Sequence, residues 1–272
     1  MKRLSFYLSA LVAGGVLYAC QPAAPETAKP ANNKDVPEAV TAKVRAMGFS
    51  TYNIQRVDDG YVVENDIFLG DKDLDRGSQQ QLMRIGGEEQ YRTTQIVNNL
   101  PRVITVSVAS NLADVYDDAV QEAVNRYNAE NLSIRFQKVN SGGMIHFLAS
   151  PANAEYLASA GFPSGGQPHN FVRINNTFLG DVNNATRVAY IGSICAHEMG
   201  HCIGFRHTDY MNRQFSCGGA FANEGASTIG AIQIPGTPAT ADPNSWMLAC
   251  IGNNVNRPFN ANDKIALKAL YP

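Results

Sequence analysis

The chain has 272 residues, of which 44% are hydrophobic and 17% are charged, so it carries enough apolar material for a core and is not wholly disordered. Lysine and arginine number 22 against 24 acidic residues, for a net charge of −2. Without a basic surplus to neutralise phosphates, nucleic acid is excluded as an expected partner. The length fits one large domain or two small ones.

The first 19 residues predict a lipoprotein signal peptide. Two basic residues precede an uncharged apolar run, Leu4 to Val16, which is too short for a stable membrane span. The run closes at Leu17-Tyr18-Ala19-Cys20, which resembles a bacterial lipobox whose cysteine becomes the lipidated first residue. We therefore expect export and a lipid anchor at Cys20, in the outer membrane or at the cell surface, with the membrane leaflet left open. An ordinary signal peptide with a chance cysteine is the alternative.

A tether and a small N-terminal segment are expected next. Residues 20–34 are rich in Pro, Ala, Asn and Thr without an apolar period, which is typical of a flexible tether. Residues 35–97 are too few to bury a sizeable core of their own, so we expect this pro-like segment to pack against the domain after it. Its expected elements are a helix from Pro37 to Met47 ended by Gly48, a hairpin from Tyr52 to Val63 turning at Asp58-Asp59-Gly60, and a partly helical stretch from Asp71 to Arg92.

Residues 98–272 predict a second, larger domain. Strand, helix and strand patterns are followed by further strands and helices, which argues for an α+β fold. The expected strands are Val103–Val108, Leu132–Val139, Met144–Leu148 and Phe171–Ile174, and the expected helices are Leu112–Tyr127 capped by Asn111, Thr186–Cys202 stopped by Gly204, and Asp263–Leu270 capped by Asn262. The stretch from Met211 to Ser245 is loop-like.

Four cysteines remain after Cys20, and an even count in an exported chain suggests two disulfides. Cys195 and Cys202 are seven residues apart on one predicted helix, or about 10 Å along its axis. A disulfide needs Cα atoms within about 7 Å. Each of the two is therefore expected to pair with Cys217 or Cys250. Buried free thiols are the alternative.

The run from His197 to His207 reads His-Glu-Met-Gly-His-Cys-Ile-Gly-Phe-Arg-His and predicts a metal site. His197 and His201 are four residues apart, so both imidazoles leave one face of a helix. A zinc ion about 2.0–2.1 Å from each nitrogen fits between them. Glu198 lies beside that face, where it can reach a water without ligating the metal.

The end of the run supplies a third ligand. Gly204 lets the chain leave the helix and turn back, so that His207 approaches the metal from another direction. Three nitrogens leave the fourth tetrahedral corner open, as a catalytic zinc requires. The alternatives are satisfied core histidines, or a structural zinc closed by a fourth protein ligand. Within zinc peptidases, Glu224 is an alternative third ligand of the gluzincin kind, against which Gly204 and His207 argue.

The run resembles the metzincin signature of zinc endopeptidases. The stretch from His197 to Tyr210, which ends in His-Thr-Asp-Tyr, is similar to the bacterial dual-action HEIGH metallopeptidase family, with Met199 in place of the usual Ile. The resemblance extends over most of the chain from about Val36. It implies a metzincin-like zincin fold with a mixed twisted β-sheet, an active-site helix and a C-terminal helix.

The resemblance also implies a function. The expected activity is that of an endopeptidase that hydrolyses polypeptides with a zinc-activated water, with Glu198 as general base and then general acid. One catalytic Zn²⁺ and a monomer are expected. A surface-anchored binding lipoprotein on the same fold, without peptidase activity, is the alternative. A weakly supported expectation places the peptide substrate along an edge strand at Gly143 to Leu148. Structural Ca²⁺ at Asp181, Asn183 and Asn184 matches no calcium loop and is unsupported.

Further site residues come from the same resemblance. Metzincins place a methionine beneath the zinc, and Met247 has the corresponding position ahead of the last helix. Astacin-like members add a tyrosine ligand two residues later, where this chain has Ala249. Asp209 is expected to support a ligand histidine or the backbone near Met247. Tyr210 is a candidate donor to a developing oxyanion, with simple packing as its alternative.

A latency hypothesis concerns the pro-like segment. In astacin-like zymogens an aspartate of the propeptide occupies the zinc. Glu64-Asn65-Asp66-Ile67 resembles part of that motif, and Phe68-Leu69-Gly70-Asp71 is an adjoining match, which makes Asp66 and Asp71 candidates. The same four residues recur at 178–181, so ordinary surface carboxylates are the alternative.

Overall fold

The computed structural model describes residues 35–76, 90–218, 230–238 and 242–272. The predicted signal peptide, the tether and Cys20 therefore lie outside the described residues, as does Glu224. Within these ranges, no helix has the length and apolarity needed to cross a membrane.

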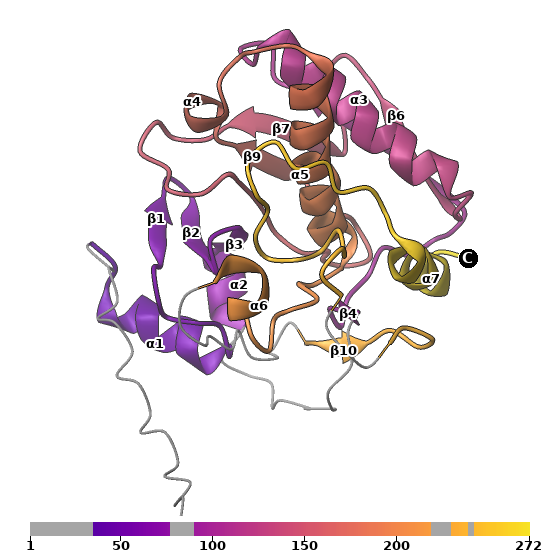
Figure 1. The fold of residues 1–272 in the computed structure, drawn as a ribbon. Helices are drawn as coiled ribbons and strands as arrows, with labels where there is room; N and C mark the ends of the chain where they lie inside the picture. The colour runs from indigo at the N-terminus through magenta and orange to yellow at the C-terminus, as the bar shows by residue number, and fades with distance from the viewer. Residues whose placement is uncertain (1–34, 77–89, 219–229, 239–241) are drawn as a thin grey trace, which may run out of the picture. The chain divides into compact units, whose positions relative to one another are not determined.

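Helices and strands alternate irregularly along the chain (Figure 1). The helices are α1 (Glu38–Ala46), α2 (Asp71–Arg76), α3 (Asp114–Ala129), α4 (Asn176–Leu179), α5 (Ala185–Ile203), α6 (Gln214–Cys217) and α7 (Ala261–Leu270). The strands are β1 (Gln55–Val57), β2 (Gly60–Val63), β3 (Ile67–Gly70), β4 (Tyr91–Arg92), β5 (Arg102–Val108), β6 (Ile134–Lys138), β7 (Ile145–Ala149), β8 (Ala158–Ala160), β9 (Phe171–Ile174) and β10 (Ile232–Gln233).

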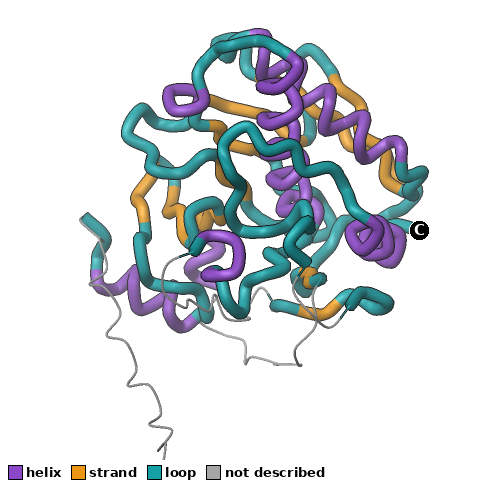
Figure 2. The backbone as a smooth tube through the Cα atoms, viewed as in Figure 1, coloured by secondary structure: helices purple, strands orange, loops and turns teal. Residues whose placement is uncertain are grey.

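The described strands form one large mixed sheet and one small sheet, which confirms the predicted α+β class. The large sheet has eight strands in the order β1-β2-β3-β8-β9-β7-β5-β6. Its pairs β5–β6, β5–β7 and β7–β9 are parallel, whereas β8 runs antiparallel to β9. Strands β4 and β10 pair separately. Figure 2 shows a long loop between residue 242 and α7.

Helices α3 and α5 pack against each other and against the large sheet (Figure 1). The apolar positions of α3 at three- and four-residue spacing, from Val115 to Tyr127, are buried as its sequence pattern predicts. The helix begins at Asp114 after an Ala113 cap, later than the predicted Asn111 cap. Helix α5 is buried at every position from Tyr190 to Ile203 because packing surrounds it on all sides.

The described N-terminal residues 35–76 join the large sheet through β3. Strand β3, which the sequence analysis missed, pairs with β2 on one side and runs parallel to β8 on the other. The register pairs Ile67 with Ala160, and the Ala160 N–H donates to the Asp66 carbonyl at 2.9 Å. The segment also has its own apolar cluster, which includes Val44, Ile54 and Val63. It therefore covers the β8 edge of the sheet.

The predicted substrate strand is wrong. Gly143 to Leu148 contributes β7, which is hydrogen-bonded to β5 on one side and to β9 on the other. A strand with both neighbours in place has no free edge for a peptide. The edge that segment 35–76 covers belongs to β8 instead.

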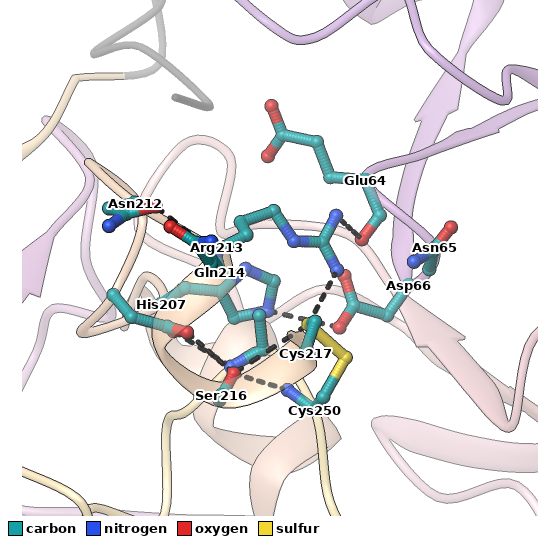
Figure 3. The surroundings of a disulfide bond; sticks show 12 residues. Glu64, Asn65, Asp66, His207, Asn212, Arg213, Gln214, Ser216, Cys217 and Cys250 are labelled. Atoms are coloured by element: carbon teal, nitrogen blue, oxygen red, sulfur yellow. Dashed lines mark hydrogen bonds and ion pairs between the residues drawn. A yellow bond between two sulfur atoms is a disulfide. The ribbon is translucent and has the colours of Figure 1, made fainter. Parts of the chain in front are cut away.

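The predicted cysteine pairing is also wrong. Cys217 and Cys250 form a disulfide with each other, and Figure 3 shows Ser216 beside it. Cys195 and Cys202 are free thiols that are 0% exposed within the hydrophobic core. The spacing argument correctly separated these two but assumed that all four cysteines pair. Burial of α5 on every side leaves its cysteines as core residues.

Candidate metal centre

Helix α5 carries the site, and both of its ends are fixed by particular residues. The Asn184 side chain caps the first turn by accepting a hydrogen bond from the Arg187 N–H. Asn184, one of the residues considered for Ca²⁺ and left unsupported, is therefore engaged in the helix cap. The helix ends at Gly204 with φ of 110°, a conformation that side chains disfavour. A Cβ there would also lie 3.1 Å from the Gln95 carbonyl oxygen. The chain can therefore turn back and bring His207 to the helix.

Backbone carbonyls orient the two histidines of the helix. His197 Nδ1 lies 2.9 Å from the Trp246 carbonyl oxygen, and His201 Nδ1 lies 2.9 Å from the Phe205 carbonyl oxygen. A carbonyl only accepts, so each Nδ1 carries the proton and each Nε2 presents a lone pair. The His197 Nε2 is buried without a hydrogen-bond partner. These are the features of histidines arranged to bind a metal.

The four donor atoms lie at separations that suit zinc. His201 Nε2 and His207 Nε2 are 3.2 Å apart. Asp66 Oδ2 lies 3.0 Å from His207 Nε2 and 3.6 Å from His197 Nε2. Ligands bound 2.0–2.1 Å from a tetrahedral zinc are about 3.4 Å apart. Among the described residues this is the one group of His, Cys, Asp or Glu side chains close enough to hold a metal ion, and it fits the ion that the sequence predicts.

The electrostatics favour the ligand forms of His201 and Asp66. Burial lowers the pKa of His201 well below its usual value, and the neighbouring His197 and His207 lower it further. Burial raises the pKa of Asp66, but the charge of His207 and the contacts with both histidines outweigh it and hold that pKa below its usual range. Neutral imidazoles and a carboxylate are what a divalent cation binds.

Glu198 lies beside the cluster but outside it. The residue is 2% exposed, and its Oε2 is buried without a hydrogen-bond partner. Burial raises the pKa of the carboxyl, the charge of Asp66 raises it further, and His207 partly opposes both. Together with His197 it lines a cavity next to the metal centre. A buried acid with one oxygen directed to no protein partner is suited to handling a proton in that cavity.

The predicted Met247 lies directly under the helix. It is 0% exposed, and a Cβ added to Gly200 would come within 2.6 Å of its sulfur. The Thr208 N–H donates to the Met247 carbonyl at 2.9 Å, which ties this turn to the residue after His207. Glycine at position 200 therefore allows the methionine to pack beneath the ligand histidines.

Asp263 anchors the same turn, a role that the sequence analysis missed. The Trp246 N–H donates to Asp263 Oδ2 at 3.1 Å, and the Ser245 hydroxyl donates to Oδ1 at 2.9 Å. The Gln90 side chain also donates to Oδ1, at 2.8 Å. Burial raises the pKa of this carboxyl to about 6, opposed by the hydrogen bonds it accepts. Because Trp246 orients His197, Asp263 supports the metal centre from a distance.

The two remaining predicted residues, Asp209 and Tyr210, have different surroundings. Asp209 accepts hydrogen bonds from the Ala249 N–H at 2.9 Å and from the Ser216 hydroxyl at 2.5 Å, so it lies against the backbone just after Met247. Tyr210 is buried against Tyr91, with ring centroids 4.5 Å apart. The cavity lining does not include Tyr210. This geometry favours the packing alternative for the tyrosine.

The turn before β3 presents Asp66 to the histidines. Glu64 and Asn65 have φ of 55° and 72°, in the left-handed region that bends the chain sharply. Arg213 Nη1 donates to the Glu64 carbonyl at 2.7 Å, as Figure 3 shows, and Arg206 Nη2 lies 3.7 Å from the buried Glu64 carboxylate. The other candidate, Asp71, is exposed at the first position of α2 and is not in the cluster.

The site combines two histidines from a buried helix, a third histidine after a glycine turn and a glutamate beside them. Metal-dependent hydrolases use sites of this kind. A profile described as dual-action HEIGH metallo-peptidase matches residues 63–271. The chain belongs to this family and is a metallopeptidase.

Comparisons with individual proteins give only distant likenesses. No curated protein sequence matches the chain. Among solved structures, the crystal structure of myroilysin has a TM-score of 0.41 and 16% identity, covering 66% of this chain and 87% of that one. A second structure of myroilysin has a TM-score of 0.40 and 18% identity, covering 65% of this chain and 82% of that one.

Proposed function

We propose that the chain is an exported zinc endopeptidase of the metzincin type that is made in a latent form. The observation that carries the proposal is the buried Glu198 carboxylate, whose Oε2 has no protein partner, beside three histidines whose Nε2 atoms converge. A zinc ion held there would supply Lewis-acid chemistry, by polarising the scissile carbonyl and acidifying a water.

Glu198 moves the proton in this proposal. Its carboxylate accepts a proton from the attacking water and returns it to the amine of the departing half of the substrate. Burial keeps bulk water away from the carboxylate, so the proton stays where the amine leaves. His197 and His201 hold the metal in a fixed direction because their Nδ1 atoms are bound to backbone carbonyls.

Two features support the metzincin type. His207 provides the third nitrogen, 3.2 Å from His201 Nε2, so that no downstream glutamate is needed. Met247 lies under Gly200 as the metzincin pattern requires. Ala249 has no side-chain ligand atom, so the tyrosine-assisted variant of the chemistry does not apply.

The latent form rests on Asp66. Its carboxylate is the fourth donor of the cluster, at the position that a catalytic zinc leaves for water and substrate. The same turn leads into β3, which covers the β8 edge. Segment 35–76 therefore blocks both the metal and a sheet edge. The competing function is a closed structural zinc site without activity, which the fourth ligand would also suit.

Export and lipid anchoring remain proposals from the sequence. The Cys217–Cys250 disulfide supports export, because disulfides persist in oxidising compartments outside the cytosol. We expect the wild-type chain to partition into the detergent phase and the Cys20→Ser chain to remain in the aqueous phase. Equal partitioning would exclude the anchor.

The activity is tested with casein and the full-length chain. We expect Asp66→Ala to hydrolyse casein, a chelator to stop it, and Zn²⁺ to restore it. Adding Glu198→Ala should leave zinc content and the thermal midpoint unchanged while the rate falls by about two to four decades. If Asp66→Ala and the double variant hydrolyse casein equally, Glu198 does not have this role. Absence of hydrolysis from every zinc-loaded variant would favour the closed structural site.

A further inference from the structure

A cavity of about 400 Å³ extends from the metal centre along α5. Its metal end contains His197, Glu198 and Asp66, and exposed Tyr52 lies at its opening. Five of the side chains that line the cavity are large and apolar. They are Ile194, Trp246, Leu157, Leu248 and Ile251.

The position of Arg257 within this lining is fixed by its backbone. Its N–H donates to the Ser193 hydroxyl at 2.8 Å, and Ser193 precedes His197 by one turn of α5. Four helical residues span about 6 Å along the axis. The Arg257 carbonyl also accepts a hydrogen bond from Arg126. The backbone of Arg257 is therefore held about one helical turn of α5 from His197, and its side chain lines the same cavity as His197.

The Arg257 guanidinium retains donors for a ligand. Its one side-chain hydrogen bond within the described residues is donated by Nη1 to the Cys250 carbonyl, at 3.0 Å. No described carboxylate forms an ion pair with it. Burial lowers the pKa of this group, opposed by the charges of Asp209 and Asp263. A partly desolvated guanidinium inside a cavity binds a carboxylate more strongly than one at the surface does.

The proposed function decides which part of a substrate faces the cavity. Glu198 returns a proton to the departing amine, and Glu198 and Ile194 line the cavity together. The residue that supplies the amine is therefore the one whose side chain enters. A side chain that enters the cavity shares it with Arg257, which also lines it.

We propose that Arg257 is a specificity-determining residue, which selects peptides with an acidic side chain on the amine side of the scissile bond. This inference rests on the proposed function for its substrate, but binding of the acidic side chain can be measured without hydrolysis. The lining also contains three acidic residues. Asp66 and Glu198 lie at the metal end, and Glu155 is exposed.

Trp246 provides a readout that does not depend on activity. It is the one tryptophan of the chain, it is 2% exposed, and it lines the cavity. We would titrate the full-length Asp66→Ala chain with Glu-Ala amide and with Gln-Ala amide, which mimic the amine product and differ in one charge. The tryptophan fluorescence then gives a Kd for each dipeptide.

We expect the Kd of the glutamate dipeptide to be about 10- to 100-fold lower than that of the glutamine dipeptide, because one charge-assisted hydrogen bond contributes a difference of this size. Arg257→Gln should abolish this preference while the glutamine dipeptide binds as before, and Arg257→Lys should retain part of it. Arg135→Gln is the matched control, because it removes an exposed arginine of β6 and should leave the preference intact.

Equal affinities for the two dipeptides, no saturable signal with either, or a preference that survives Arg257→Gln would each overturn the proposal. Hydrolysis of matched longer peptides is scored separately. Selective binding without any hydrolysis would contradict the proposed function and leave the acid-binding cavity standing. Hydrolysis without selectivity would contradict only the role of Arg257.

Discussion

Replacing Asp66 with alanine should activate the intact chain. The carboxylate lies 3.0 Å from His207 Nε2 and occupies the fourth donor position of the metal centre. The backbone carbonyl of the same residue accepts from the Ala160 N–H, and this bond survives the substitution. The variant therefore removes the side-chain block and leaves the strand pairing in place.

The size of the effect is set by the contact that is lost. One charge-assisted interaction of a buried carboxylate contributes about 1.5–3 kcal/mol, and about 1.4 kcal/mol corresponds to a factor of ten. If the blocked form predominates, removing that contact raises the fraction of open chains by about 10- to 100-fold. Full activity is not expected, because Arg213 and Arg206 still hold Glu64 on the domain.

The assay is the initial rate of cleavage of a quenched fluorescent peptide by zinc-loaded, full-length chains. Asp71→Ala is the control, because Asp71 is an exposed aspartate five residues away and outside the cluster. We expect Asp66→Ala to be about 10- to 100-fold faster than wild type and Asp71→Ala to match wild type. An active wild type whose rate does not change in Asp66→Ala would refute the latency argument.

Three further predictions concern the metal centre and its support. His207→Ala should weaken zinc binding by at least about a hundredfold, whereas Glu224→Ala should leave zinc binding unchanged. Competition with a chromophoric chelator measures both affinities, and the reverse result would indicate a gluzincin site. Gly200→Ala should destabilise the fold by about 1–3 kcal/mol, because the new Cβ would lie 2.6 Å from the sulfur of Met247, and an unchanged urea midpoint would contradict that packing. Asp263→Asn should lower the free energy of unfolding by about 2–4 kcal/mol, because an amide group would face hydrogen-bond donors, and a loss below about 0.5 kcal/mol would show that the carboxyl does not anchor this turn.

The long helices and the metal ligands could be predicted because their signals are local. The apolar spacing of α3 extends over more than three turns, and α5 is rich in apolar residues along its length. The ligand set depends on the four-residue spacing of two histidines on a helix and on one glycine that ends the helix. Both features lie within the eleven consecutive residues from His197 to His207. Gly204 adopts the left-handed conformation that ends the helix and redirects the chain.

Strands β3 and β8 could not be predicted, because they depend on distant partners. Strand β8 has three residues, Ala158–Ala160, and shows no alternation that would separate it from a loop. Strand β3 owes its place to pairing with β2 and β8. The sequence pattern instead favours β7 as the edge strand that binds the substrate, because its apolar pattern is clearer. In the structure both edges of β7 are paired with other strands.

The choice between Asp66 and Asp71 also needed the fold. Both lie in short stretches that resemble the same motif, and a third copy ends at Asp181. The choice among these aspartates depends on contacts between residues more than a hundred positions apart in the sequence. The hydrogen bond from Arg213 to the Glu64 carbonyl is one such contact. The cysteine pairing failed for a similar reason, since burial of α5 on every side is a property of the packed domain.

The most direct test of the central claim is X-ray absorption spectroscopy at the zinc edge of the full-length chain, with and without acetohydroxamate. Three imidazole ligands are expected in both wild type and Asp66→Ala. Acetohydroxamate should change the zinc spectrum of Asp66→Ala and leave that of wild type unaltered, because only the variant has an exchangeable fourth position. Fewer than three imidazoles in wild type, or a zinc in Asp66→Ala that the hydroxamate cannot reach, would contradict a catalytic metal held by His197, His201 and His207.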